Sequence, residues 1–196
     1  MVAEPQIPSG ESQIGRRVVA QQELDRIAAA LAAQPDAQHA LQLLLTETRR
    51  LTRAEAGTVY LREANRLRFA AFQNDVLTRR LGAGEAERRL KGDPLTLTEP
   101  SIAGYVLLTH GTVNVVDAYA IPLDRPYQFD RRVDVKTGYR TQSMLALPIR
   151  DSRGIVIGVL ALINALNDIG GVIPFGTERQ ALVDTLLRYA ARVMPT

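Results

Sequence analysis

The periodicity of the apolar residues changes near residue 58 from that of helices to that of strands, and this change restricts the possible folds more than any other feature. Over residues 16–53 the apolar residues recur at helical spacing, in two stretches separated by Gln34-Pro35-Asp36. From Thr58 onward they follow the period of two that is typical of half-buried strands. Because the strands then follow one another with one short helix among them, the βαβ alternation of a doubly wound sheet is absent. The pattern predicts an α+β fold with a central antiparallel sheet of about six strands.

Helices are predicted at both ends of the chain. The first spans about residues 16–33, Pro35 ends it, and Asp36 can cap a second helix over residues 37–53. The last spans about residues 177–193 and has an apolar stripe of its own. We expect these terminal helices to cover one face of the sheet, and a layer of one helix and a lid loop to cover the other.

The strands are expected at residues 58–61, 67–72, 95–97, 113–116, 143–149 and 155–163. A turn at residues 151–154 joins the last two as a hairpin. Residues 164–174 are interpreted as a loop before the final helix.

The middle of the chain is less regular. Ser101 is placed to cap a short helix over residues 102–109, and Gly111 is placed to end it. Residues 77–93 are rich in glycine and charge and are interpreted as a mobile excursion, for which a helical turn is an alternative over part of its length. The connection over residues 117–138 is long for a compact domain, which is typical of a functional loop.

The chain is expected to form one domain with a helical extension. Residues 1–15 are polar and are expected to form a disordered tail. Residues 16–35 are a candidate signalling or dimerisation helix, and residues 36–196 form the α+β domain with its C-terminal helix. The N-terminus lacks a secretory signal, and no apolar run approaches the roughly 20 residues that span a bilayer. We therefore expect a cytoplasmic protein with no membrane partner.

The residue inventory excludes several kinds of chemistry. There are no cysteines, so thiol nucleophiles, disulfides and Cys-ligated metals are excluded. The two histidines, His39 and His110, lie far apart in the sequence, and a structural role outweighs a catalytic or ligand role for both. We expect a chain that is not an enzyme and has no metal and no cofactor.

The charge pattern favours ion pairs over a nucleic-acid surface. The net charge of +3 comes from 24 basic and 21 acidic residues, and the recurring arginine pairs each lie near acidic residues. A nucleic-acid-binding surface would show a one-sided basic stripe instead. Asp130 and Asp134 share the long connection with Arg131, Arg132 and Lys136, so we interpret them as salt-bridge or polar ligand contacts.

The helix start at Ser101-Ile102-Ala103-Gly104 carries a hypothesis of its own. First-turn N–H groups have no partner inside a helix, small side chains let a ligand approach them, and the helix dipole favours an anion there. An ordinary capped helix explains the same residues and is the commoner case.

Four segments, in this order, resemble the GAF domain family. They are residues 101–106, 111–119, 134–149 and 154–164, within a likeness that extends over about residues 36–193. The sequence is similar to the GAF domains of cyclic-nucleotide phosphodiesterases and to bacterial GAF domains attached to HD-GYP, GGDEF or cyclase output domains. The resemblance implies a regulatory sensory domain that binds a small ligand, such as a cyclic nucleotide, and controls an output domain or partner protein. The apolar stripes of the terminal helices further predict a homodimer.

The resemblance also implies a set of ligand contacts. In the cyclic-nucleotide binders, the backbone N–H groups at the positions of Ile102 and Ala103 hold the cyclic phosphate. The other implied contacts come from strand positions facing the base and from the lid loop: Thr58, Phe72, Gln73, Asp134, Thr137 and Thr141.

The sequence departs from the family pattern at several positions. Gln73 stands in place of an Asp, Ala161 in place of a Glu, and Ala165 in place of a Lys. Arg179-Gln180 replaces the acidic pair of the same motif, so the Lys–Asp salt bridge of that motif cannot form in the family's way. The alternative function is therefore a ligand-free dimerisation or protein-interaction module with a vestigial pocket. Bilin attachment and free-methionine-sulfoxide reduction both need a cysteine and are excluded.

Overall fold

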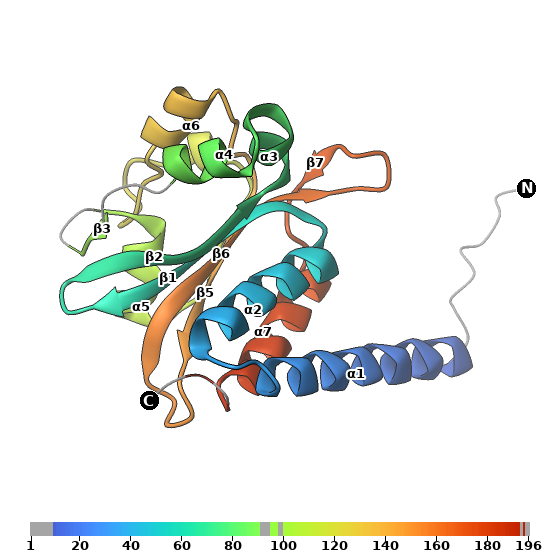
Figure 1. Cartoon of the computed structure of the whole chain (residues 1–196). Coiled ribbons are helices and arrows are strands. Elements are labelled where there is room, and N and C mark those ends of the chain that lie inside the picture. Colours follow the sequence, from blue (N-terminus) through green and yellow to red (C-terminus); the bar gives the residue numbers. More distant parts are fainter. Residues whose placement is uncertain (1–9, 91–94, 98–99, 193, 195–196) are drawn as a thin grey trace, which may run out of the picture.

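The computed structural model describes residues 10–90, 95–97, 100–192 and 194, and the chain folds into three layers (Figure 1). One face of a central sheet is covered by the long helices α1 (Gly10–Ala32), α2 (Ala37–Thr52) and α7 (Thr177–Ala190). The other layer holds the shorter helices α3 (Asp75–Leu81), α4 (Ala83–Leu90), α5 (Ile102–Thr109) and α6 (Arg132–Thr137). The predicted α+β class is confirmed.

The sheet is antiparallel throughout, as predicted. Its strands are β1 (Ala54–Glu63), β2 (Arg66–Asn74), β3 (Leu95–Thr96), β4 (Val113–Val115), β5 (Met144–Arg150), β6 (Val156–Leu166) and β7 (Val172–Ile173). They lie in the order β3-β2-β1-β6-β5-β4, and β7 pairs with the end of β6. The hairpin of β5 and β6 forms where the sequence predicted it, and the long strands β1 and β6 form the middle of the sheet.

Helix α1 begins earlier than predicted. It starts at Gly10, so the expected disordered tail does not reach residue 15, while residues 1–9 lie outside the described residues. No proline occurs between Gly10 and the helix predicted from residue 16, so nothing in that stretch prevents the helix from extending back. The next boundary follows the prediction: Asp36 caps α2 by accepting a hydrogen bond from the N–H of His39 at 2.9 Å.

Two short helices replace most of the excursion predicted over residues 77–93, of which 91–93 lie outside the described residues. Asn74 caps α3 by accepting a hydrogen bond from the N–H of Leu77 at 2.9 Å. Gly82, with φ of +80°, separates α3 from α4. The charges that obscured a helical period lie at favourable ends, because α3 and α4 each have an acidic first turn and arginines in the last turn.

Three further boundaries differ from the prediction. His110 rather than Gly111 ends α5, because His110 takes the left-handed conformation (φ +60°) and its N–H donates to the carbonyl of Val106. The predicted loop at residues 164–174 contains strand residues near both of its ends, since β6 continues to Leu166 and pairs with β7. The long connection contains a 3₁₀ turn, Ala118–Ala120, and helix α6.

Alternation along the central strands builds the two faces of the sheet. Val59, Leu145 and Leu160 are buried in the cluster that holds α2 and α7 against the sheet. Gly57 lies on this face, and a Cβ there would come within 2.8 Å of Leu45 Cδ1 on α2. The opposite face, with Ala161 among its residues, lies toward α5.

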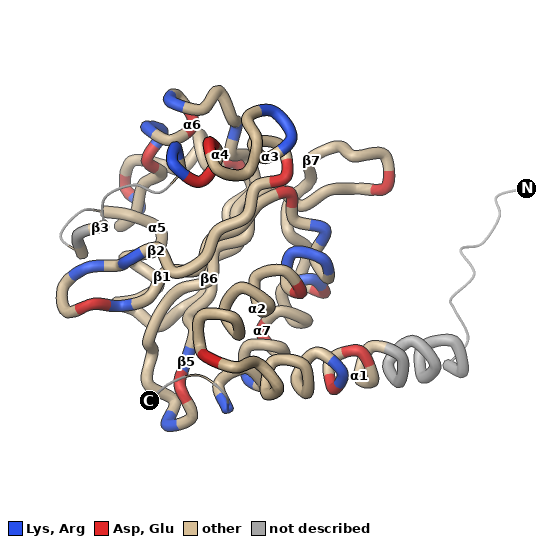
Figure 2. The backbone as a smooth tube through the Cα atoms, viewed as in Figure 1, with Lys and Arg blue, Asp and Glu red and all other residues tan. Residues whose placement is uncertain are grey.

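Charged residues of both signs are interspersed along the chain (Figure 2). The interpretation of the arginine pairs as ion-paired is confirmed for five of their members: Arg49, Arg50, Arg88, Arg89 and Arg132. Over the described residues, no helix combines the length and the hydrophobicity needed to cross a membrane.

Candidate ligand-binding cavity

A cavity of about 150 Å³ lies between the sheet and the layer of α4, α5 and α6. Strands β1, β2 and β6 contribute its floor, and the start of α5 and the segment 128–141 contribute its roof. Six of the eight residues inferred as ligand contacts from the sequence lie in its wall: Thr58, Phe72, Ile102, Ala103, Asp134 and Thr141.

The structure places Gln73 and Thr137 elsewhere. Gln73 follows Phe72 on β2, so the pleat turns its side chain to the helical face, where it accepts from Arg49 at 2.7 Å and donates to Thr46 at 2.7 Å. The hydroxyl of Thr137 donates to the carbonyl of Val133 at 2.7 Å, inside α6.

Most of the cavity wall is apolar. The rings of Tyr60 and Phe69 pack with centroids 4.9 Å apart, and Met144 and Ile163 close the floor beside them. Burial raises the pKa of Tyr60 to about 12, although a hydrogen bond with Thr58 works in the opposite direction. The phenol therefore stays neutral at physiological pH.

The first turn of α5 lies in the cavity wall. Ser101 is the predicted cap, and its hydroxyl accepts from the N–H of Gly104 at 3.0 Å. The remaining first-turn N–H groups have no intrahelical partner, and two of the residues that carry them, Ile102 and Ala103, line the cavity. Ser101 also forms a β-bridge with Gln128, which brings the lid segment against the start of this helix.

Asp134 joins separate parts of the lid segment, residues 117–141, to one another. Its carboxylate accepts from the backbone N–H of Thr141 at 2.7 Å, from the Thr141 hydroxyl at 3.0 Å and from the Tyr119 hydroxyl at 3.1 Å. Asp134 is only 4% exposed, so these bonds are made away from water. Two of the three lid residues that were expected to contact a ligand, Asp134 and Thr141, thus contact each other.

A second contact of the lid is built around Tyr119. The guanidinium carbons of Arg131 and Arg140 lie 4.2 and 3.6 Å from its ring centroid. Arg140 also pairs with Asp117 at 3.1 Å. Cation–π and ion-pair contacts at a partly exposed position are individually weak.

A polar cluster that was not predicted from the sequence joins the lid to the sheet. The Tyr139 hydroxyl, at the lid's end, donates to Glu55 Oε2 at 2.7 Å, and Asn164 Nδ2 lies 3.0 Å from each of these atoms. Burial, followed by the hydrogen bond to Glu55, raises the pKa of Tyr139 above its ordinary value. Asn164 has φ of +55°, a conformation that Asn tolerates better than most residues.

A hydrogen bond takes the place of the Lys–Asp salt bridge that the family motif forms between the end of β6 and α7. Arg179, which stands where an acidic residue is usual, donates from Nη2 to the carbonyl of Leu166 at 3.1 Å. The α7 helix is thus tied to the end of β6 by a hydrogen bond to the backbone instead of the Lys–Asp salt bridge.

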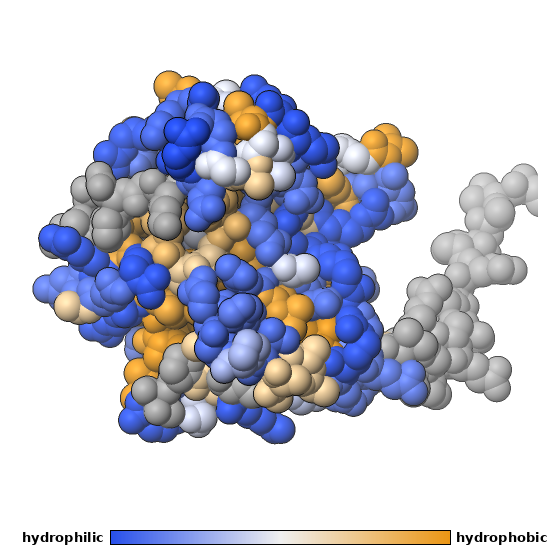
Figure 3. Space-filling model, viewed as in Figure 1, coloured by the Kyte–Doolittle hydropathy of each residue, from blue (hydrophilic) through white to orange (hydrophobic). Residues whose placement is uncertain are grey.

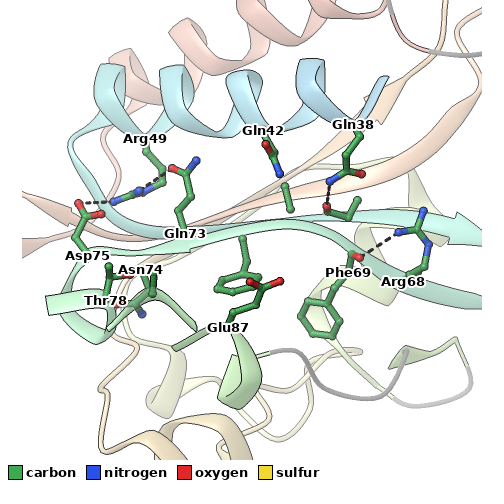
Figure 4. A pocket seen from close by; sticks show the side chains of 14 residues that line it. Gln38, Gln42, Arg49, Arg68, Phe69, Gln73, Asn74, Asp75, Thr78 and Glu87 are labelled. Carbon is green, nitrogen blue, oxygen red and sulfur yellow. Dashed lines mark hydrogen bonds and ion pairs between the residues drawn. The ribbon is translucent and has the colours of Figure 1, made fainter. Parts of the chain in front are cut away.

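A larger hollow of about 800 Å³ lies along β2, between α2 and the helices α3 and α4 (Figure 4). Its polar side chains are largely engaged: Gln38 donates to the carbonyl of Ala70 at 2.6 Å, and Arg49 pairs with Asp75 at 2.6 Å. The face seen in Figure 3 is mostly hydrophilic, with hydrophobic residues along the sheet between the two helical layers. An open groove with bonded polar walls is a poorer site for a small molecule than an enclosed apolar cavity.

A central sheet that carries long helices on one face and a lidded cavity on the other defines an α+β ligand-binding module. The family model of the GAF domain matches residues 36–194, and the chain belongs to this family. GAF domains are regulatory sensor domains that bind small ligands. In the described part of the chain, no three His, Cys, Asp or Glu side chains gather as a metal site.

The chain is similar to parts of two Drosophila enzymes. It is 44% identical over 66 residues to the dual 3',5'-cyclic-AMP and -GMP phosphodiesterase 11 of Drosophila melanogaster, a match that covers 34% of this chain and 4% of the relative. It is 32% identical over 120 residues to the cGMP-specific 3',5'-cyclic phosphodiesterase of Drosophila virilis, which covers 60% of this chain and 13% of the relative. The chain therefore spans a small part of the length of these relatives.

A solved structure shares the fold. The GAF domain of a phosphoenolpyruvate-protein phosphotransferase from Acinetobacter matches with a TM-score of 0.62 at 16% identity, over 89% of this chain and 92% of that one.

Proposed function

We propose that this chain is the ligand-sensing regulatory part of a signalling protein and that its ligand binds in the central cavity. The observation that carries the proposal is the position of the cavity, between a lid held by separable polar contacts and a sheet whose other face carries the terminal helices. A ligand that alters the lid contacts would bias an equilibrium between closed and open arrangements.

A chain of polar contacts supports transmission across the sheet. Tyr139 lines the cavity and donates to the Glu55 carboxylate, while the backbone carbonyl of Glu55 accepts from Arg49 Nη2 at 2.9 Å. Arg49 belongs to α2, which packs against α1 and α7. Movement of the lid would therefore act on the start of β1 and on the helical layer, and the terminal helices would pass the change to an output domain or partner.

Cyclic nucleotides are one candidate class of ligand. Two relatives are named for enzymes that act on them. The cyclic phosphate would lie at the first turn of α5, near Ile102 and Ala103, where backbone N–H groups and the helix dipole favour an anion. The role would be regulatory, with no turnover of the bound nucleotide.

Titration calorimetry with cyclic AMP and cyclic GMP tests this assignment. Ala103→Leu places a larger side chain in the cavity, whereas Leu108→Ala changes the exposed side of the same helix, where Leu108 is 62% exposed. Binding to the parent chain that is lost in Ala103→Leu and kept in Leu108→Ala would support a nucleotide in this cavity. Equal binding to all three proteins would show that the nucleotide binds outside this cavity. Absence of binding would mean either that the cavity binds a different ligand or that the domain is a ligand-free interaction module with a vestigial pocket.

A further inference from the structure

The charge of the cavity wall restricts its ligand. Among the described residues of the wall, the charged side chains are Asp130 and Asp134, and none is Lys or Arg. Asp134 is engaged by Thr141 and Tyr119, and Asp130 pairs with Arg132 at 2.7 Å. An anionic ligand would meet two carboxylates, with backbone N–H groups as its compensation, and a cation would have to replace contacts that already satisfy both carboxylates.

The size of the cavity also restricts its ligand, and it favours a small molecule. Its volume of about 150 Å³ is half the roughly 300 Å³ at which pockets for drug-sized ligands begin. An apolar cavity of about 150 Å³ accommodates a single benzene ring. A base, a sugar and a phosphate together would require the lid to leave its closed position.

The cavity wall combines apolar side chains with the first turn of α5. Tyr60, Phe69 and Met144 are among the apolar side chains, against which an aromatic ring or a branched aliphatic group can pack. The start of α5 at Ile102 and Ala103 presents backbone donors, which suit a carbonyl or other neutral acceptor.

From these three features we infer that the closed cavity takes a small uncharged molecule, with a body of about one ring and one hydrogen-bond acceptor directed at the start of α5. The inference rests on the proposed function, because it assigns the ligand class of the same sensory site. It departs from the nucleotide assignment in ligand size and in charge.

Four probes separate these features: acetophenone has a ring and a neutral acceptor, toluene lacks the acceptor, benzoate adds a charge, and cyclic GMP is the nucleotide. Each is titrated into the parent chain, Ala103→Leu and Leu108→Ala, after circular dichroism has shown that the variants fold. We expect saturable binding of acetophenone to the parent and to Leu108→Ala, and at least about tenfold weaker binding to Ala103→Leu. Toluene should bind about two- to tenfold more weakly than acetophenone, the range for one neutral hydrogen bond, and benzoate and cyclic GMP should bind more weakly still.

The possible failures are distinct. Cyclic GMP binding more tightly than acetophenone, and lost in Ala103→Leu, would overturn this inference and leave the sensory cavity standing. Acetophenone binding equally to the parent and Ala103→Leu would overturn it by placing the probe outside the cavity. Binding of none of the four probes to the parent would overturn the inference and count against the sensory site as well. If Ala103→Leu does not fold, Ile163→Phe, another enlargement in the cavity wall, replaces it under the same expectations.

Discussion

At the scale of single residues, the side-chain amide of Asn164 connects strand β6 to the end of the lid segment by several hydrogen bonds. Its Oδ1 accepts from the N–H of Gln142 at 2.8 Å, and its Nδ2 lies 2.9 Å from the carbonyl of Arg140 and within reach of Glu55 and Tyr139. The side chain is 2% exposed, so these partners have no ready access to water. Asn164 therefore holds the end of the lid segment against the sheet.

Replacing Asn164 with Ala should lower the free energy of unfolding by about 3 kcal/mol, because buried groups lose their partners and a left-handed backbone becomes strained. Asn114→Ala is the matched control: its amide also donates to a backbone carbonyl, that of Phe175 at 3.0 Å, but from an exposed position. The control should cost less than about 1 kcal/mol. Urea unfolding measures both, and equal losses would contradict the role given to Asn164.

The burial of Tyr60 and Tyr139 predicts that these two phenols lose their protons only at unusually high pH. Burial raises the pKa of Tyr60 to about 12, and burial together with the Glu55 hydrogen bond raises that of Tyr139 further above its ordinary value. Because the folded pKa values lie above the unfolded value, the stability that the neutral phenols contribute is complete below about pH 10 and is lost as the pH rises through the folded pKa. Two of the six tyrosines should therefore remain protonated at about pH 11 when phenolate absorbance is followed. A single transition of all six near pH 10 would show that neither phenol is protected.

At the scale of elements, Asp134 on α6 holds the parts of the lid segment together. Asp134→Asn removes the charge that Thr141 and Tyr119 share and turns one acceptor atom into a donor, so it should loosen residues 117–141. We expect faster trypsin cleavage after Arg131 and Arg132, with a loss of about 1–3 kcal/mol in the free energy of unfolding. Asp124→Asn, at an exposed position in the same segment, should leave both measurements unchanged. Cleavage at the parent rate in Asp134→Asn would mean that other contacts hold the lid.

The elements also show which structural features can be predicted from a few neighbouring residues in the sequence. The caps Asp36 and Ser101 and the turn of the β5–β6 hairpin were predicted because each depends on a few neighbouring residues. Helices α3 and α4 were missed because elements of seven and eight residues carry too few apolar positions to define a period. The charges at their ends were a signal that could have identified them.

At the scale of the whole molecule, we expect α1 to take part in dimerisation. Leu24, Ile27 and Leu31 pack its second half onto the domain, while its first half runs past α2 and α7 (Figure 1). We expect light scattering to show a dimer at high micromolar concentration, and a chain lacking residues 1–19 to be monomeric, since that deletion keeps the packed half of the helix. A monomeric parent, or a dimer unaffected by the deletion, would exclude dimerisation through this part of α1.

The candidate cavity was only partly predictable. Family correspondence brought Thr58, Phe72 and the start of α5 to one place, and the structure agrees. It grouped Gln73 with Phe72, although the pleat of a strand sends neighbouring side chains to opposite faces. The cluster of Glu55, Tyr139 and Asn164 joins residues 84 and 109 positions apart, which no local period can reveal.

The central claim is that a small molecule in the cavity acts on the lid and, through the sheet, on the terminal helices. Hydrogen–deuterium exchange tests it most directly, in the parent chain and in Ala103→Leu, with acetophenone, cyclic AMP or cyclic GMP added in turn. The account predicts that at least one of these probes slows exchange in the first turn of α5 and in residues 129–141. It further predicts a change around Arg49 on α2, and the loss of all these effects in Ala103→Leu. Unchanged exchange with every probe, protection confined to the groove along β2, or identical protection in Ala103→Leu would contradict the account.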